Sequence, residues 1–366
     1  MAKGQEYNWE RRFLRDEHTG VEIVQLTGFP TINQAFYFHV PSFTPDSKTL
    51  VFLSYTELRR DAAPNIFRVD VDGTNLVQLT DRPGIESAVL APDGKTVYYL
   101  IGGELHSVDI NSAERDGDKI VGAIEGIEPW INGPVRLHLS DTGSISSEGK
   151  TFITGRKMLD GRNVILHYRI LSSEASIIYE HPGNIAHVQF DPYRSNRIVF
   201  CTSGDSQNRN MWTLSSAGTD ARILEMRAGT GHFAWLKNES LSKDKVVMST
   251  VTSPRGAILS CGVNDAEPKL IAQGKNFWHA SPSKDGEWII SDTNWPDEGL
   301  QLVQVRTGKY KTLCYPRSSQ GHPQWTHPHP FFSPDGKMVV FNSDRTGICQ
   351  IYLAKITEEF LRSFDE

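Results

Sequence analysis

The chain has 366 residues, 38% of them hydrophobic and 22% charged, which suits one large globular domain or two ordinary ones and excludes a disordered chain. Its 38 Lys and Arg residues against 44 Asp and Glu residues give a formal charge of -6 without a basic run, which argues against a nucleic-acid partner. No apolar run reaches the length of a membrane helix and the charged N-terminus lacks the apolar segment of a secretory signal, so we expect a cytoplasmic protein with no membrane partner.

A hairpin pattern recurs along the whole chain. It is clearest in FTPDSKTLVFL, LAPDGKTVYYL and FSPDGKMVVFN, where a Pro-Asp turn precedes a β-branched or aromatic run. Weaker copies bring the number of turns to seven, about 40 to 55 residues apart. They are centred near Asp46, Asp93, Glu148, Asp191, Lys243, Asp285 and Asp335. Most hairpins are followed by a second pair of strand-like segments, which predicts four antiparallel strands per repeat.

Repeats of this kind are typical of β-propeller blades, and seven repeats lie within the range of about four to eight blades that closes a ring. The last repeat has only three good strands, whereas residues 20–26, GVEIVQL, form a strand-like run with no hairpin of their own. We predict that this N-terminal strand closes the last blade and thereby covers an exposed edge. Only the final ITEEFLRSFDE has helix-like spacing. The prediction is an all-β chain whose residues 1–366 form a single seven-bladed β-propeller domain.

Histidines recur at or near one position of the repeat, ahead of the turn, where structure alone does not require them. The first strand of each blade lines the axis of a propeller, so side chains at this position meet at one mouth of the ring. The recurring residues are His39, His187, His232, His279, His327 and His329. We therefore expect a polar pocket there, with His39 and His187 among its substrate-binding groups.

Part of this set has the composition of a metal site. His327 and His329 alternate as i and i+2, which in an extended strand places both rings on one face, within reach of one ion. His279 from the adjacent blade and Gln324 complete a shell of three imidazoles and one carbonyl. Imidazole suits zinc, iron, copper or nickel, whereas an amide oxygen and open water positions favour manganese or another harder ion. The alternative is that these imidazoles only cap backbone groups at a strand start. The four cysteines stand outside this position and are expected to be buried thiols.

The segments QWTHPHPFFSPDG, HASPSKDG and GHFAW resemble the oligogalacturonate lyases, intracellular polysaccharide lyases built as seven-bladed propellers, and the resemblance covers nearly the whole chain. It implies a divalent ion, typically Mn²⁺, held by four residues, and a histidine base. The implied ligands are His279, Gln324, His327 and His329, and the implied base is His232. The chain departs from the family in FCTSG, where Thr202 and Ser203 replace a His-Glu pair, and in Arg209, which stands one residue early.

The resemblance implies metal-assisted β-elimination of short oligogalacturonates during pectin degradation. His232 would take the C5 proton, Arg209 would bind substrate and share the developing charge, and the product would be 4,5-unsaturated. Two enzyme alternatives remain, a lyase acting on a different uronate oligosaccharide and a metal-dependent hydrolase. A third alternative is a TolB-like scaffold propeller that binds partners without catalysis, because the FSPDG and DRTG segments of this chain resemble those of TolB-like propellers.

Overall fold

The computed structural model describes most of the chain: residues 3–55, 63–112, 119–128, 143–203, 210–226, 232–237, 245–250, 256–293, 296–321 and 326–366. Regular structure in these residues is almost all β, and its one helix, α1 (Glu358–Arg362), lies where the helix-like spacing was predicted. No described segment forms a helix with the length and apolar character that crossing a membrane requires.

Two compact units make up the chain. The first contains Met1–Tyr7, Val40–Val69 and Asn75–Ile223, and the second contains Asn8–His39, Asp70–Thr74 and Leu224–Glu366. The extent of a single domain over 1–366 therefore stays a prediction.

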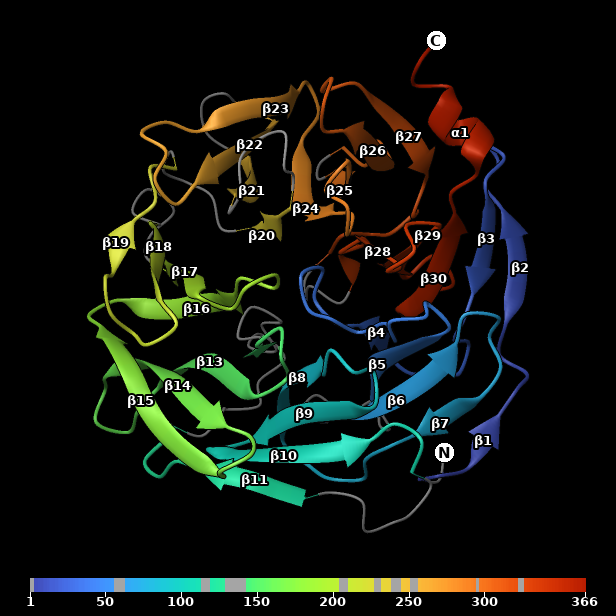
Figure 1. Cartoon of the computed structure of the whole chain (residues 1–366). Coiled ribbons are helices and arrows are strands. Elements are labelled where there is room, and N and C mark those ends of the chain that lie inside the picture. Colours follow the sequence, from blue (N-terminus) through green and yellow to red (C-terminus); the bar gives the residue numbers. More distant parts are fainter. Residues whose placement is uncertain are drawn as a thin grey trace. The chain divides into compact units, whose positions relative to one another are not determined.

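The first unit holds four antiparallel sheets, mostly of strands that follow one another in the chain (Figure 1). Their strand orders are β1-β7-β6-β5, β11-β10-β9-β8, β12-β13-β14-β15 and β16-β17-β18-β19. The strands are β1 (Glu6–Tyr7), β5 (Thr49–Tyr55), β6 (Pro64–Asp70), β7 (Leu76–Gln78), β8 (Ile85–Leu90), β9 (Thr96–Ile101), β10 (Glu104–Asp109), β11 (Lys119–Ala123), β12 (Ser144–Ile145), β13 (Thr151–Lys157), β14 (Asn163–Arg169), β15 (Glu174–His181), β16 (Asn184–Phe190), β17 (Arg197–Ser203), β18 (Met211–Ser215) and β19 (Arg222–Ile223).

The second unit holds three more antiparallel sheets, of order β20-β21-β22-β23, β24-β25-β26-β27 and β2-β3-β30-β29-β28. Its strands are β2 (Arg12–Arg15), β3 (Glu22–Gln25), β4 (Asn33–Ala35), β20 (Phe233–Leu236), β21 (Lys245–Thr250), β22 (Ala257–Gly262), β23 (Lys269–Gln273), β24 (Phe277–Pro282), β25 (Trp288–Thr293), β26 (Leu300–Gln304), β27 (Tyr310–Cys314), β28 (Phe331–Phe332), β29 (Met338–Ser343) and β30 (Gln350–Lys355). The described residues thus form seven antiparallel sheets, which confirms the prediction of an all-β chain with the seven blades of a β-propeller.

The predicted turns form as their residues require. In the last repeat, Asp335 Oδ1 accepts hydrogen bonds from Ser333 Oγ at 2.6 Å and from the Lys337 amide at 3.1 Å. Gly336 then adopts a φ of 72°, a conformation that costs glycine little, and its amide donates to the Ser333 carbonyl. Asp285 and Gly286 repeat this geometry before β25. The predicted turn near Lys243 lies outside the described residues.

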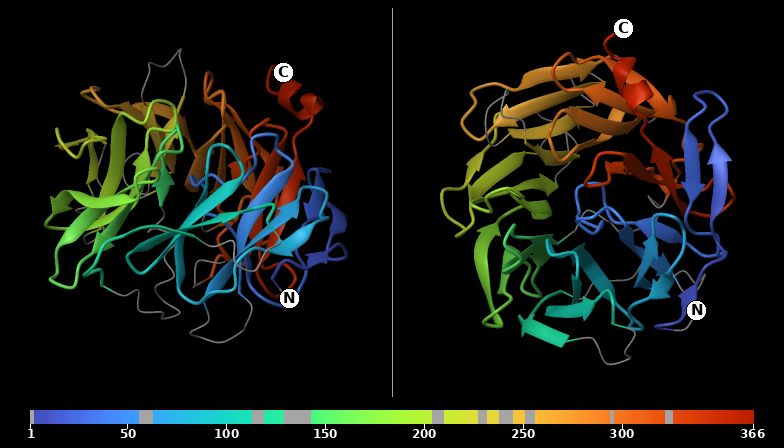
Figure 2. Two further views of the ribbon diagram at one scale, coloured as in Figure 1. Left: turned by 60° about the horizontal axis from the view of Figure 1, so that its bottom comes forward. Right: turned by 45° about the vertical axis from the view of Figure 1, so that its right-hand side comes forward.

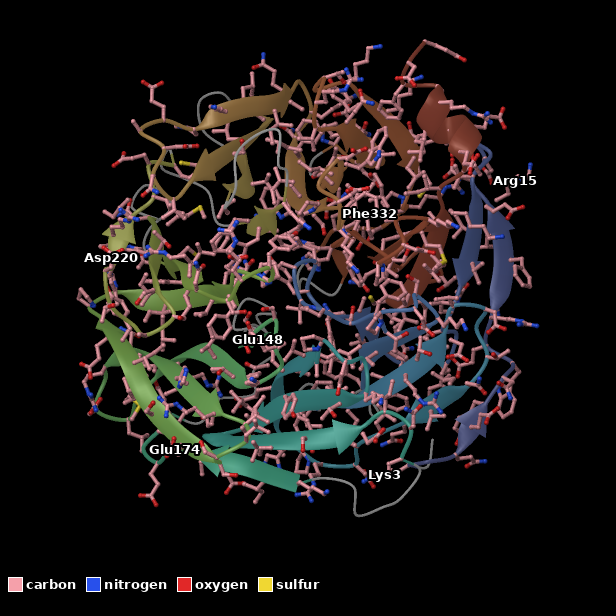
Figure 3. The ribbon with its side chains drawn as sticks, viewed as in Figure 1. Lys3, Arg15, Glu148, Glu174, Asp220 and Phe332 are labelled. Carbon is pink, nitrogen blue, oxygen red and sulfur yellow. The ribbon has the colours of Figure 1, made fainter. Side chains whose placement is uncertain are left out.

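The predicted closure of the last blade by the N-terminal strand is confirmed. Val24 of β3 pairs with Leu353 of β30, and Figure 2 shows dark-blue N-terminal strands beside the red C-terminal ones. One feature was not predicted, since β2 adds a fifth strand outside β3. Its side chains are mostly exposed, and Arg15, labelled in Figure 3, is one of them.

The core of each sheet is apolar, as the β-branched and aromatic runs predict. In the second unit, Phe341 stacks on Tyr352 at 5.5 Å between ring centroids, and both side chains are fully buried. Phe364, which follows α1, is also buried and contacts Trp288 edge to face. All four cysteines are buried free thiols, as expected.

Candidate metal centre

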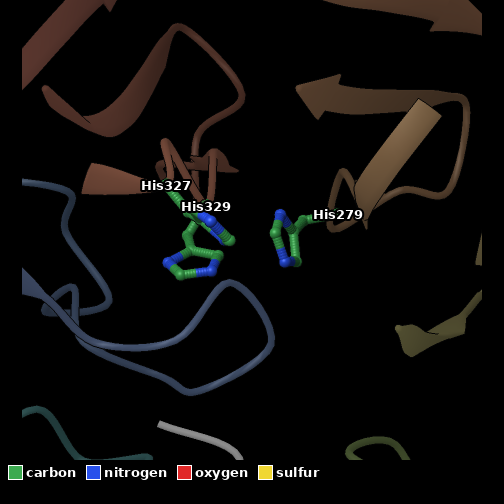
Figure 4. Close-up of side chains that lie close together, drawn as sticks. All are labelled: His279, His327 and His329. Carbon is green, nitrogen blue, oxygen red and sulfur yellow. The ribbon is translucent and has the colours of Figure 1, made fainter. Parts of the chain in front are cut away.

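Three of the predicted histidines lie together in the second unit. His279 comes from β24, and His327 and His329 come from the segment that leads into β28 (Figure 4). One ring nitrogen from each residue can be chosen so that all three lie within 4.8 Å of one another. His279 and His329 are buried and His327 is partly exposed, so the cluster has one side open to a ligand. Three converging imidazoles are a known donor set for a divalent transition metal.

Irregular backbone brings these rings together. Between Phe277 and Ala280 the pairing of β24 with β25 shifts register, and this bulge carries His279. His329 has a φ of 45°, an uncommon conformation for a residue other than glycine. The expectation that alternation along an extended strand would align His327 and His329 was therefore wrong in its geometry. Their ring centroids are nevertheless 5.6 Å apart.

A buried carboxylate, Asp292 of β25, lies directly behind the cluster. Its Oδ2 atom is 2.8 Å from His279 Nδ1, and its Oδ1 atom accepts a hydrogen bond from the His279 amide at 2.7 Å. Oδ2 also accepts from the His329 amide at 3.3 Å. Burial raises the pKa of Asp292 to about 8, while the two backbone hydrogen bonds act in the opposite direction. A cation bound by the three imidazoles would favour the ionised form of this carboxylate, because the two charges are opposite.

His232, the predicted base, lies next to the cluster at the start of β20. Its ring centroid is 4.4 Å from that of His279 and 5.2 Å from that of Trp278. The side chain is partly exposed, so a ligand has access to it. The grouping of nitrogens within 4.8 Å consists of the other three histidines, which leaves His232 as a neighbour of the cluster.

An aromatic wall from the segment after β4 closes another side of the cluster. The Tyr37 ring lies 4.8 Å from His329, 5.8 Å from His279 and 5.1 Å from His39, all in edge-to-face contacts. Phe38 packs against His279 at 5.4 Å. Sequence reasoning missed both aromatic residues, although they directly precede His39 in the chain.

Comparison with known proteins shows where this arrangement belongs. The oligogalacturonate lyase of Dickeya dadantii (strain 3937) is 24% identical over 394 aligned positions, which cover 98% of this chain and 99% of the relative. The oligogalacturonide lyase of Pectobacterium atrosepticum is also 24% identical, over the same shares of the two chains. This chain is thus similar over its whole length to curated oligogalacturonate lyases. No protein-family model matches it.

Solved structures of oligogalacturonate lyases have the same fold. One such structure, in complex with manganese, superposes with a TM-score of 0.83 at 21% identity and covers 99% of this chain and all of the other. A second, from Vibrio parahaemolyticus, gives a TM-score of 0.82 at 19% identity over 98% of this chain. These likenesses support the same propeller fold for this chain.

The structure brings four of the residues singled out by the family resemblance into contact: His232, His279, His327 and His329. His39 joins them through Tyr37, and its Nε2 atom is buried. Burial lowers the pKa of His39 to about 3, and the nearby His232 contributes in the same direction, so this imidazole is neutral.

The roles of the remaining predicted site residues stay predictions. Gln324 and Arg209 lie outside the described residues, as does the side chain of Ser203. His187 belongs to β16 of the first unit, where it is buried with a φ of 55°, and its role in substrate binding stays a prediction. Thr202, at the other family departure, is buried on β17.

Asp292 is a further residue beside the cluster that sequence reasoning overlooked. A signal was present in the sequence, because the turn near Asp285 fixes the register of β24 against β25. Ala280 pairs with Ser291, and this register places Asp292 opposite the bulge that carries His279. An acid facing a proposed metal ligand across a hairpin is a candidate outer-shell partner.

Proposed function

We propose that this chain is a metal-dependent oligogalacturonate lyase, which cleaves short uronate oligosaccharides by β-elimination. The observation that carries the proposal is the cluster of His279, His327 and His329 with His232 against its side. Its full-length relatives are named for this activity, and one structure of a family enzyme contains manganese. We therefore propose Mn²⁺ as the bound ion and oligogalacturonate as the substrate.

The reaction removes the proton at C5. This proton is only weakly acidic, because its loss adds a second negative charge next to the carboxylate. The electron pair of the C–H bond becomes the C4–C5 double bond, the bond from C4 to the glycosidic oxygen breaks, and the departing oxygen takes a proton. A divalent ion, when bound, supplies positive charge beside the uronate carboxylate and so makes the C5 proton more acidic. The protein contributes the base, the orientation of the sugar and the exclusion of water.

His232 is the proposed base, because it is accessible and stands beside the cluster without being one of its three members. Imidazole is the side chain whose ordinary pKa lies nearest neutrality, and a positioned general base contributes roughly 10²- to 10⁴-fold to a rate. His279, His327 and His329 would hold the ion, and we propose Gln324 as a further ligand. Their binding face would fix the uronate carboxylate close to His232.

His39, His187 and Arg209 are the proposed substrate-binding groups, and Arg209 is also proposed to share the charge that develops at the carboxylate. For His39 the support is its place beside Tyr37, next to the proposed ligands. A neutral imidazole there offers one donor and one acceptor to sugar hydroxyl groups.

The test is to remove bound metal from the full-length protein with a chelator, add short oligogalacturonates and follow ultraviolet absorbance before and after Mn²⁺ is resupplied. The 4,5-unsaturated product is a conjugated enoate and absorbs, whereas hydrolysis releases reducing ends without this absorbance. We expect absorbance to rise only once Mn²⁺ returns. New reducing ends without absorbance would show a hydrolase, and a protein that neither binds Mn²⁺ nor cleaves the oligomer would contradict the proposal.

A further inference from the structure

Asp292 contacts both segments that supply the proposed ligands, and the inference drawn from it rests on the metal-dependent function proposed above. The carboxylate bonds the ring and the backbone of His279 on β24, and through Oδ2 it bonds the backbone of His329. Its exposed fraction is 2%, and those of His279 and His329 are 1% and 0%, so water does not compete for these hydrogen bonds.

The contact with His279 determines which ring nitrogen is available to a metal. An ionised Asp292 can only accept a hydrogen bond, so with Oδ2 at 2.8 Å from Nδ1 it places the proton of the neutral ring on Nδ1. Nε2 then carries the lone pair. Outer-shell carboxylates act in this way on metal-binding histidines, fixing the tautomer and the ring orientation and raising the basicity of the ligand.

Thr293, which follows Asp292 in β25, makes a second contact with the part of the chain around His327. The Thr293 carbonyl accepts a hydrogen bond from Gln320 Nε2 at 2.8 Å, and both of these residues are buried. Gln320 and His329 therefore flank the stretch that contains His327, and consecutive residues of one strand hold both of them. The end of β25 thus holds one described residue before His327 and one after it.

We propose that Asp292 is a positioning residue of the metal centre, which sets the Nδ1-protonated tautomer of His279 and locks the His329 backbone beside it. Asp292→Asn tests this with little change in volume. The amide can still accept from the His279 backbone, but it presents an N–H group to Nδ1 and so favours the tautomer with the proton on Nε2. We expect the dissociation constant for Mn²⁺ to rise about 10- to 100-fold.

The measurement is titration of the full-length, metal-free protein with Mn²⁺, with the free ion followed by electron paramagnetic resonance. Asp191→Asn is the matched control, because Asp191 is also a buried acid whose carboxylate accepts a backbone hydrogen bond, from Tyr193, but it lies in the first unit. We expect the control to bind Mn²⁺ as the unchanged protein does. Unchanged Mn²⁺ affinity in folded Asp292→Asn would overturn the positioning role while leaving the proposed function intact. Failure of the unchanged protein to bind Mn²⁺ would overturn both proposals.

A second measurement does not depend on the folding of an Asp292 variant. In the unchanged protein loaded with diamagnetic Zn²⁺, nitrogen-15 spectra of the imidazoles distinguish the two tautomers. We expect His279, assigned by the loss of its signals in His279→Asn, to carry its proton on Nδ1. A proton on Nε2 would rule out the proposed role of Asp292.

Discussion

The imidazole rings of His232 and His279 lie 4.4 Å apart, centroid to centroid, with their planes at 63°. His232 directly precedes β20 and His279 lies in β24, and these are the first strands of two consecutive sheets. Because the rings are so close, one site could use His279 as the proposed metal ligand and His232 as the proposed base. His279 faces His327 and His329, whereas His232 lies beside them against Trp278. The division can be tested by separating metal binding from turnover.

Replacement of His232 by Ala should abolish lyase turnover and leave Mn²⁺ bound. Loss of a positioned base lowers the rate by about 10²- to 10⁴-fold, whereas the three proposed ligands remain. The checks are the initial rate of absorbance increase with oligogalacturonates and the metal content of the purified variant. Normal activity would remove His232 as the base, and loss of Mn²⁺ would instead make it a ligand.

His327→Ala should lose both properties. Removing a directly bonded imidazole should weaken Mn²⁺ binding by more than the roughly 10- to 100-fold typical of outer-shell partners, and activity should fall with occupancy. His18→Ala is a suitable control, because His18 is an exposed histidine of the same unit that packs against Tyr315 instead of the cluster. A variant of His327 that binds Mn²⁺ normally would show that the cluster is not the metal site.

Much of this arrangement could be predicted from the sequence, because it depends on local chemistry. Pro-Asp-Gly turns specify hairpins wherever they occur, and histidines repeated ahead of them must fall on equivalent strands. The short edge strands β1 and β2 could not be found this way. β1 has only two residues and pairs with the distant β7, whereas β2 is a mostly exposed strand of four residues that pairs with its neighbour β3, and neither has a regular hydrophobic pattern. The left-handed backbone of His329 was also beyond reach, since the flanking prolines suggest an extended segment.

The C-terminal tail should contribute strongly to stability through one side chain. Phe364 is 1% exposed and packs on Trp288 and Phe360, so Phe364→Ala should lower the free energy of unfolding by about 3–5 kcal/mol. Phe13→Ala provides the comparison, because Phe13 is 72% exposed on β2 and its loss should cost less than about 0.5 kcal/mol. Urea denaturation of the two variants measures the difference, and equal losses would contradict this account of the tail.

Asp16 should make the free energy of unfolding depend on pH in acidic solution. Burial raises its pKa, but hydrogen bonds from the amides of Tyr315, Thr19 and His18 and from the Thr19 hydroxyl outweigh burial, so the pKa is lowered below 3.8. The folded state therefore gains stability from this carboxylate above pH 3.8 and loses it as the pH falls through the lowered pKa.

Asp16→Asn should accordingly cost about 1 kcal/mol at neutral pH and less as the pH falls below 3.8. Urea denaturation of both proteins at about pH 7 and near the acid limit of folding gives the comparison. A cost that stays constant over this range would show that the charge of Asp16 is not what stabilises the turn between β2 and β3.

The sheet that joins β3 to β30 has a consequence for biosynthesis. Lys355 of β30 and Glu22 of β3 form an ion pair between these adjacent strands although they are 333 positions apart in the chain. β3 therefore cannot pair with β30 until the ribosome has made the residues between them. His327 and His329 directly precede β28 of this same sheet. The sheet next to the histidine cluster can therefore be completed only after β30 has been made, and a product that stops short of β30 should lack the cluster.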